Sequence, residues 1–196
     1  PLDRAAIPQP HDPSKLKLPA HYPDTPLVRE DFARYYDEIS RFDGNFGEVL
    51  KELDARGLAA NTLVVFMGDN GASQFRGKGT LYEMGVNVPL LVRWPGKVKP
   101  GVAEELISGE DLAPTFLQSA GLAAPKEMTG RSFLPLLRGE AYTARSHVFA
   151  ERGAHGSGLP NNSAAFDLGR CVITPTHKLI YNALWQLPYW PVDFAG

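Results

Sequence analysis

The sequence predicts a mixed α/β fold with a largely parallel sheet, followed by a small antiparallel sheet near the carboxyl end. Three observations lead to this prediction: one long stretch with helical spacing, two short apolar runs of strand length, and a late change to short strand-like runs separated by turns. Helices that alternate with buried strands form an α/β layer. We therefore expect one α/β part over residues 1–140 and a small antiparallel part over residues 141–196.

The first 26 residues contain seven prolines, and we expect an irregular surface segment because proline lacks a backbone donor and restricts the residue before it. A helix is then predicted from Pro26, with Asp24 or Thr25 as its N-cap. Apolar residues recur every three to four positions along this stretch until Gly57 supplies the stop. This is the pattern of a long amphipathic helix.

Two apolar runs follow, NTLVVFM at residues 61–67 and the run from Val88 to Trp94. Their lack of alternation is typical of parallel strands that are covered on both faces. A short helix is expected between Ser108 as cap and Gly121 as stop. Beyond residue 141, the runs SHVFAER, GRCVIT and HKLIYNAL have strand length and turn residues between them, which predicts the antiparallel sheet.

The composition excludes several classes of function. Twenty basic against 22 acidic residues leave no basic excess, so no nucleic-acid partner is predicted. The longest purely apolar run, at 63–67, is far too short to cross a membrane. The single cysteine, Cys171, allows no intrachain disulfide and is expected to be a small buried apolar residue on a strand.

The stretch GDNGASQFRGKGTLYEMG, residues 68–85, contains the candidate site. Asp69 and Asn70 follow an apolar strand directly and offer two hard oxygen donors, which suit Ca²⁺ or Mg²⁺ better than a soft metal. Lys78 lies between Gly77 and Gly79, which we expect to let the backbone approach an anion closely. A plain turn with a solvated lysine is the alternative. A phosphate-binding P-loop is excluded by the spacing and by the glycine after Lys78.

The runs YYDEISRFDGNFGEVLKELDARGLAANTLVVFMGDNG and GKGTLYEMGVNVPLLVRWPG resemble the sulfatase family of the alkaline-phosphatase-like superfamily. EDLAPTFLQSAGL and GRSFLPLLRG fit the segments that follow, so the resemblance covers about residues 22–152. Within the family, the sequence looks most like bacterial sulfatases similar to heparan N-sulfatase. The resemblance implies an α/β sandwich in which Asp69 and Asn70 bind the active-site cation and the catalytic Lys78 binds the sulfate group.

The same resemblance implies a formylglycine nucleophile and further aspartate ligands for the cation. The chain contains neither a C/S-x-P-x-R motif nor an Asp-Asp pair, so we expect it to be the carboxyl-terminal part of a sulfatase that is inactive alone. Its partner would then be the amino-terminal part of the same protein. A phosphonate monoester or phosphodiester hydrolase, or a non-catalytic binding relative, remains an alternative.

The expected substrate is a sulfated small molecule or glycan, as an ester or a sulfamate. His155, in a glycine-flanked loop, is a candidate substrate contact, with an exposed loop residue as the alternative. Trp185, Tyr189 and Trp190 are expected to seal the small sheet or to stack on sugar rings. The resemblance favours a periplasmic or secreted location, although the sequence itself leaves the compartment open.

Overall fold

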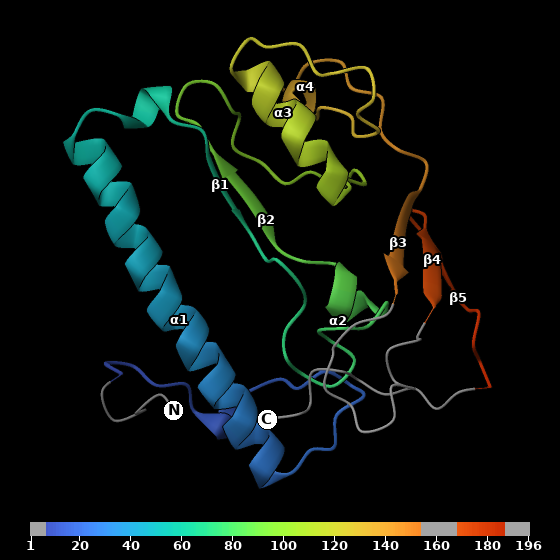
Figure 1. Cartoon of the computed structure of the whole chain (residues 1–196). Helices are drawn as coiled ribbons and strands as arrows, with labels where there is room; N and C mark the ends of the chain where they lie inside the picture. Colours follow the sequence, from blue (N-terminus) through green and yellow to red (C-terminus); the bar gives the residue numbers. More distant parts are fainter. Residues whose placement is uncertain (1–6, 154–167, 187–196) are drawn as a thin grey trace. The chain divides into compact units, whose positions relative to one another are not determined.

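The structure is a computed structural model that describes residues 7–153 and 168–186. The chain divides into two compact units, Pro1–Asn61 and Thr62–Gly196. Each unit is described by itself below (Figure 1). Among the described residues, no helix combines the length and the apolar character needed to cross a membrane.

The first unit is built around the long helix α1, Pro26–Ala55, as predicted. Thr25 is the N-cap, and its hydroxyl accepts a hydrogen bond from the backbone N–H of Val28 at 3.3 Å. The chain leaves the helix through Gly57 at φ 68°, a left-handed conformation that glycine adopts without steric cost. Both ends of α1 therefore follow from local sequence.

Over its described residues, 7–25, the proline-rich segment is irregular, as predicted, apart from the short 3-10 helix η2, Pro13–Lys15. Arg29 of α1 holds it, because its guanidinium donates to the carbonyls of Pro13, Ser14 and Leu16 at 2.9, 3.3 and 3.0 Å. A second 3-10 helix, η3, Ala59–Asn61, ends the unit.

The helix α1 buries only a short part of its apolar stripe within the first unit. The buried side chains are Phe32, Ala33 and Asp37. The Asp37 carboxylate lies inside and accepts from the backbone N–H of His11 at 2.7 Å, with the His11 ring nitrogen Nδ1 at 2.9 Å. Farther along the helix, Ile39, Phe42 and Val49 remain exposed.

In the second unit, strands β1, Val64–Met67, and β2, Leu90–Arg93, pair antiparallel, with Val64 opposite Arg93 and Met67 opposite Leu90. The prediction that these runs belong to a largely parallel sheet is therefore wrong for this pair. The physical reason is that a continuous apolar run indicates coverage of both strand faces but does not set strand direction. Direction depends on the connection, and here residues 68–89 return as a folded loop instead of a crossover helix.

The second unit also contains several short helices. Helix α2, Glu83–Val86, ends the loop that joins β1 to β2. The predicted helix after Ser108 begins as the 3-10 turn η4, Gly109–Asp111, continues as α3, Leu112–Ser119, and is followed by Gly121 at φ 75°. Helix α4, Leu134–Arg138, ends at Gly139 in the left-handed conformation.

The predicted small antiparallel sheet is present. Its strands are β3, Val148–Arg152, β4, Gly169–Ile173, and β5, Lys178–Asn182, in the order β3-β4-β5 with both pairs antiparallel. Cys171 is 3% exposed on β4, as expected for a small buried residue. The fold is thus a mixture of helices and small antiparallel sheets, while a boundary at residue 140 stays a prediction.

Candidate functional site

Asp69 and Asn70 follow β1 directly and are both exposed. The strand ladder ends with the bond from Gly68 N–H to the Pro89 carbonyl at 3.1 Å. Asp69 Oδ1 accepts from the backbone N–H of Asn70 at 3.0 Å, and Asn70 Nδ2 donates to the Gly71 carbonyl at 2.8 Å. Within the described part of the chain, Asp69 Oδ2 and Asn70 Oδ1 accept no hydrogen bond. Two oxygens therefore remain available to a ligand.

The loop between these residues and β2 is closed on itself by its glycines. Gly71 N–H donates to the Gly85 carbonyl at 3.2 Å, and a Cβ at Gly71 would lie 1.8 Å from the carbonyl oxygen of Met84. A Cβ at Gly77 would lie 2.0 Å from the Ala72 carbonyl oxygen. At Gly77, the atom that comes close is therefore the chain's own carbonyl oxygen. An approach of an anion to the backbone beside Lys78 stays a prediction.

Hydrogen bonds within the same loop fix the backbone of Lys78. Its backbone N–H donates to the Ala72 carbonyl at 2.7 Å, and that carbonyl also accepts from Gln74 N–H at 2.7 Å. The side chain is half-buried. Among residues 7–153 and 168–186, nothing pairs with its ammonium group. The loop therefore presents a cation on a backbone that is fixed at several points.

The donor set fits a hard cation only in part. A carboxylate and an amide oxygen are suitable ligands for Ca²⁺ or Mg²⁺, but Ca²⁺ takes roughly six to eight oxygens. The described residues bring together no group of three or more His, Cys, Asp or Glu side chains able to hold a metal. Asp69 and Asn70 fit as two ligands among several, and the others would come from outside the described residues.

Other predicted site residues are placed differently. His155, Tyr189 and Trp190 lie outside the described residues. Trp185 follows β5 and is exposed, which does not support a sealing role for this residue.

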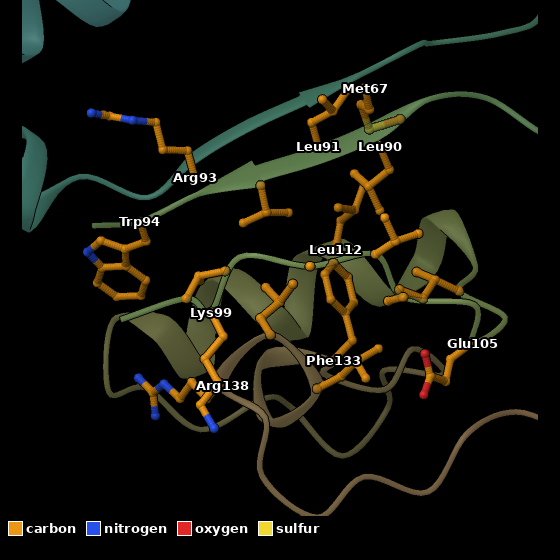
Figure 2. A pocket seen from close by; sticks show the side chains of 18 of the residues that line it. Met67, Leu90, Leu91, Arg93, Trp94, Lys99, Glu105, Leu112, Phe133 and Arg138 are labelled. Atoms are coloured by element: carbon orange, nitrogen blue, oxygen red, sulfur yellow. The ribbon is translucent and has the colours of Figure 1, made fainter. Parts of the chain in front are cut away.

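A broad groove of about 1790 Å³ lies between the β1–β2 sheet and the helices α3 and α4, and Met67, two residues before Asp69, is part of its lining. Figure 2 shows Leu112 and Phe133 in its middle, with Trp94, Lys99 and Arg138 at one end. Neither Asp69, Asn70 nor Lys78 lines it. Its walls are mostly aliphatic and aromatic, so its middle resembles an uncovered core, although the carboxylates of Glu104, Glu105 and Glu140 also belong to the lining.

One strongly bonded carboxylate of the second unit was missed by sequence reasoning. Asp111 is fully buried and accepts from the backbone N–H groups of Ser108 at 2.9 Å and Arg131 at 2.7 Å. Arg145 donates to it through Nε at 2.9 Å and through Nη2. Burial alone raises the pKa of Asp111, but these hydrogen bonds outweigh it, and the pKa lies below its ordinary value.

A further ion pair connects the end of the site loop to the three-stranded sheet. Lys178 of β5 donates to Glu83 Oε2 at 2.5 Å, and Asn87 Nδ2 donates to Glu83 Oε1 at 2.8 Å. The hydrogen bond from Lys178 lowers the pKa of Glu83. The pair joins residues far apart in the sequence, so sequence spacing could not have predicted it.

Known proteins resemble much of the sequence of this chain. The family described as Sulfatase matches residues 5–122. The chain is 31% identical over 183 residues to an ulvan-active sulfatase of Formosa agariphila, covering 92% of the chain and 29% of that protein. It is 33% identical over 197 residues to human N-sulphoglucosamine sulphohydrolase, covering 95% and 38%.

A comparison of the folds also finds a similar protein. A solved structure from Bacteroides thetaiotaomicron, described with the metabolism of multiple glycosaminoglycans, matches with a TM-score of 0.64 at 26% identity. The match covers 85% of this chain and 40% of that one. The chain spans 29% of the length of the ulvan-active sulfatase and 38% of the length of human N-sulphoglucosamine sulphohydrolase.

Proposed function

The chain belongs to the sulfatase family, and from that premise we propose that it supplies one part of the active site of a sulfuric ester hydrolase. The observation that supports this most is the exposed pair Asp69 and Asn70 on the same closed loop as Lys78, with two oxygen acceptors and an ammonium group that have no partner among the described residues. These residues lie inside the segment that matches the family. A carboxylate and an ammonium group on one loop that do not pair with each other suit a cation and a sulfate anion.

In the proposed reaction, water cleaves the sulfur–oxygen bond of a sulfate ester and yields an alcohol and sulfate. Asp69 and Asn70 would hold a divalent cation, which when bound neutralises negative charge on the sulfate. The Lys78 ammonium would bind the sulfate group and lower the cost of the charge that develops on the leaving oxygen. The backbone bonds at Ala72 would keep this ammonium in place without rearrangement.

The nucleophile must come from outside this chain. A formylglycine is made from a C/S-x-P-x-R motif, which the sequence lacks, and Cys171 is buried on β4. We therefore propose that the chain alone does not turn over and that the complete active site includes a further segment of the same protein.

Activity of the protein encoded by the complete gene tests the role of Lys78. Lys78→Ala is expected to lower kcat with an aryl sulfate by about 100-fold or more, as for removal of an oxyanion donor. Lys126→Ala, an exposed lysine outside the loop, is the matched control and should leave kcat unchanged. Equal rates for Lys78→Ala and wild type would disprove the assigned role. Faster hydrolysis of a phosphonate monoester than of the sulfate would favour the alternative enzyme.

Calcium binding tests the metal ligands. Calorimetry on the 196-residue chain should show no micromolar site, because two protein ligands are too few. The protein from the complete gene should bind Ca²⁺, and Asp69→Ala should weaken the affinity at least tenfold. Micromolar binding by the isolated chain would contradict the proposal that the site needs ligands from elsewhere.

A further inference from the structure

In the site loop, the guanidinium group of Arg76 lies close to two aromatic rings. The guanidinium carbon of Arg76 lies 5.6 Å from the centroid of the Phe75 ring and 5.1 Å from that of the Tyr82 ring. Phe75 is 52% exposed and Tyr82 is 44% exposed. We call these three residues the Arg76 cluster. It places a positive charge and two flat apolar faces at the protein surface.

The backbone that presents Arg76 is strained. Arg76 has φ 64°, the one positive φ that a residue other than glycine adopts among the described residues. This conformation costs roughly 1–2 kcal/mol for a side chain with a Cβ. The Thr80 hydroxyl donates to the Arg76 carbonyl at 2.9 Å and also accepts from Tyr82 N–H at 3.3 Å. Buried Thr80 therefore fixes both ends of the cluster.

The Arg76 guanidinium has no carboxylate partner among the described residues. Other arginines of the chain do, such as Arg29 with Asp24 and Arg145 with Asp111. The donors of Arg76 therefore remain available to an anion, which guanidinium can bind in a bidentate manner. Arg76 and Lys78 are two positions apart, so their Cα atoms lie at most about 7.6 Å from each other. They are therefore neighbouring cations on one loop.

We propose that the Arg76 cluster is a second subsite, which binds a second anionic group on a sugar of the substrate. This inference rests on the proposed function and narrows its substrate class to glycans that carry another sulfate or carboxylate beside the sulfate that is cleaved. Lys78 binds the reacting sulfate. Arg76 binds the second anion, and the exposed faces of Phe75 and Tyr82 contact the sugar ring.

Binding of two disaccharides to the 196-residue chain tests the proposal without activity. The probes are a disulfated and a monosulfated disaccharide of the same sugars, titrated by calorimetry. We expect the disulfated one to bind about tenfold more tightly, since a hydrogen bond to a charged group contributes roughly 1.5–3 kcal/mol. Equal affinities for the wild-type chain would overturn the proposal.

The variant Arg76→Gly separates binding from folding. Glycine adopts the positive φ without strain, so the melting temperature should change little while the preference for the disulfated probe disappears. Arg76→Lys keeps the charge and should retain part of the preference. A purely structural arginine would instead lower the melting temperature of Arg76→Gly and leave the preference intact.

Kinetics on the protein from the complete gene distinguish this inference from the proposed function. Arg76→Gly should raise KM for the disulfated substrate about tenfold and leave kcat/KM for a simple aryl sulfate unchanged. If Lys78→Ala abolishes hydrolysis but Arg76→Gly leaves both substrates unchanged, the second subsite is wrong and the proposed function stands. If Lys78→Ala has no effect, the proposed function itself fails.

Discussion

Asp69 and Asp111 lie in the same unit of the chain and have opposite surroundings. Asp111 is fully buried and accepts from two backbone N–H groups and from Arg145. Asp69 is exposed and accepts only from its neighbour Asn70 among the described residues. The comparison shows which acid holds the fold and which is available to a ligand, because a carboxylate with all its acceptors occupied has none left for a cation.

Removing the buried acid should give the largest effect. Asp111→Ala leaves Arg145 without its main partner, and breaking one side of a buried ion pair costs about 3–5 kcal/mol. The matched change Asp69→Ala should alter the free energy of unfolding by less than about 0.5 kcal/mol. Urea unfolding of both variants measures the difference. Similar losses for the two would show that Asp69 also supports the fold.

A methyl group in the closed loop should have the next largest effect. Gly71→Ala places a Cβ against the Met84 carbonyl, and overpacking of this kind costs roughly 1–3 kcal/mol. Gly109→Ala is the control, because a Cβ there meets no atom within 4 Å. Thermal unfolding should show a clear loss for the first variant alone. Equal stability of the two would mean that the loop closes differently.

The ion pair between Glu83 and Lys178 should give the smallest effect, and one that depends on pH. The folded-state pKa of Glu83 lies below its ordinary value of 4.5 because Lys178 donates to it. The pair therefore stabilises the fold at pH values above about 4.5, and this contribution is lost as the pH falls through the lowered folded pKa.

The expected size is about 0.2–1 kcal/mol, since Glu83 is mostly exposed. Glu83→Gln and Lys178→Gln should each lower stability at pH 7 and match the wild type near pH 2. A difference that persists at low pH would mean that the carboxylate charge is not the cause. Chemical unfolding at several pH values measures it.

The sequence was sufficient where structure depends on near neighbours. Thr25, Pro26 and Gly57 set the ends of α1 because capping involves residues only a few positions away. Strand direction could not be predicted, since it depends on how residues 68–89 return to the sheet. The bonded centre at Asp111 was missed because its donors Arg131 and Arg145 lie 20 and 34 positions later.

The candidate site could likewise be predicted only in part. The order of Asp69, Asn70 and Lys78 was visible in the sequence because one loop carries all three. The Arg76 cluster was not, since nothing in QFRGKG indicates a positive φ or a guanidinium close to two aromatic rings. Ser108 and Asp111, three positions apart, did carry a signal, as this spacing is typical of a helix cap.

The two hydrogen bonds that meet at the Ala72 carbonyl have a consequence for how related chains can diverge. Because Gln74 N–H and Lys78 N–H share this acceptor, residues 75–77 form a small arch between two ends, Gln74 and Lys78, that are anchored at one point. The side chains on the arch can change while the anchor keeps Lys78 where it is. An engineer can therefore exchange this arch between related chains and leave the backbone position of Lys78 unchanged.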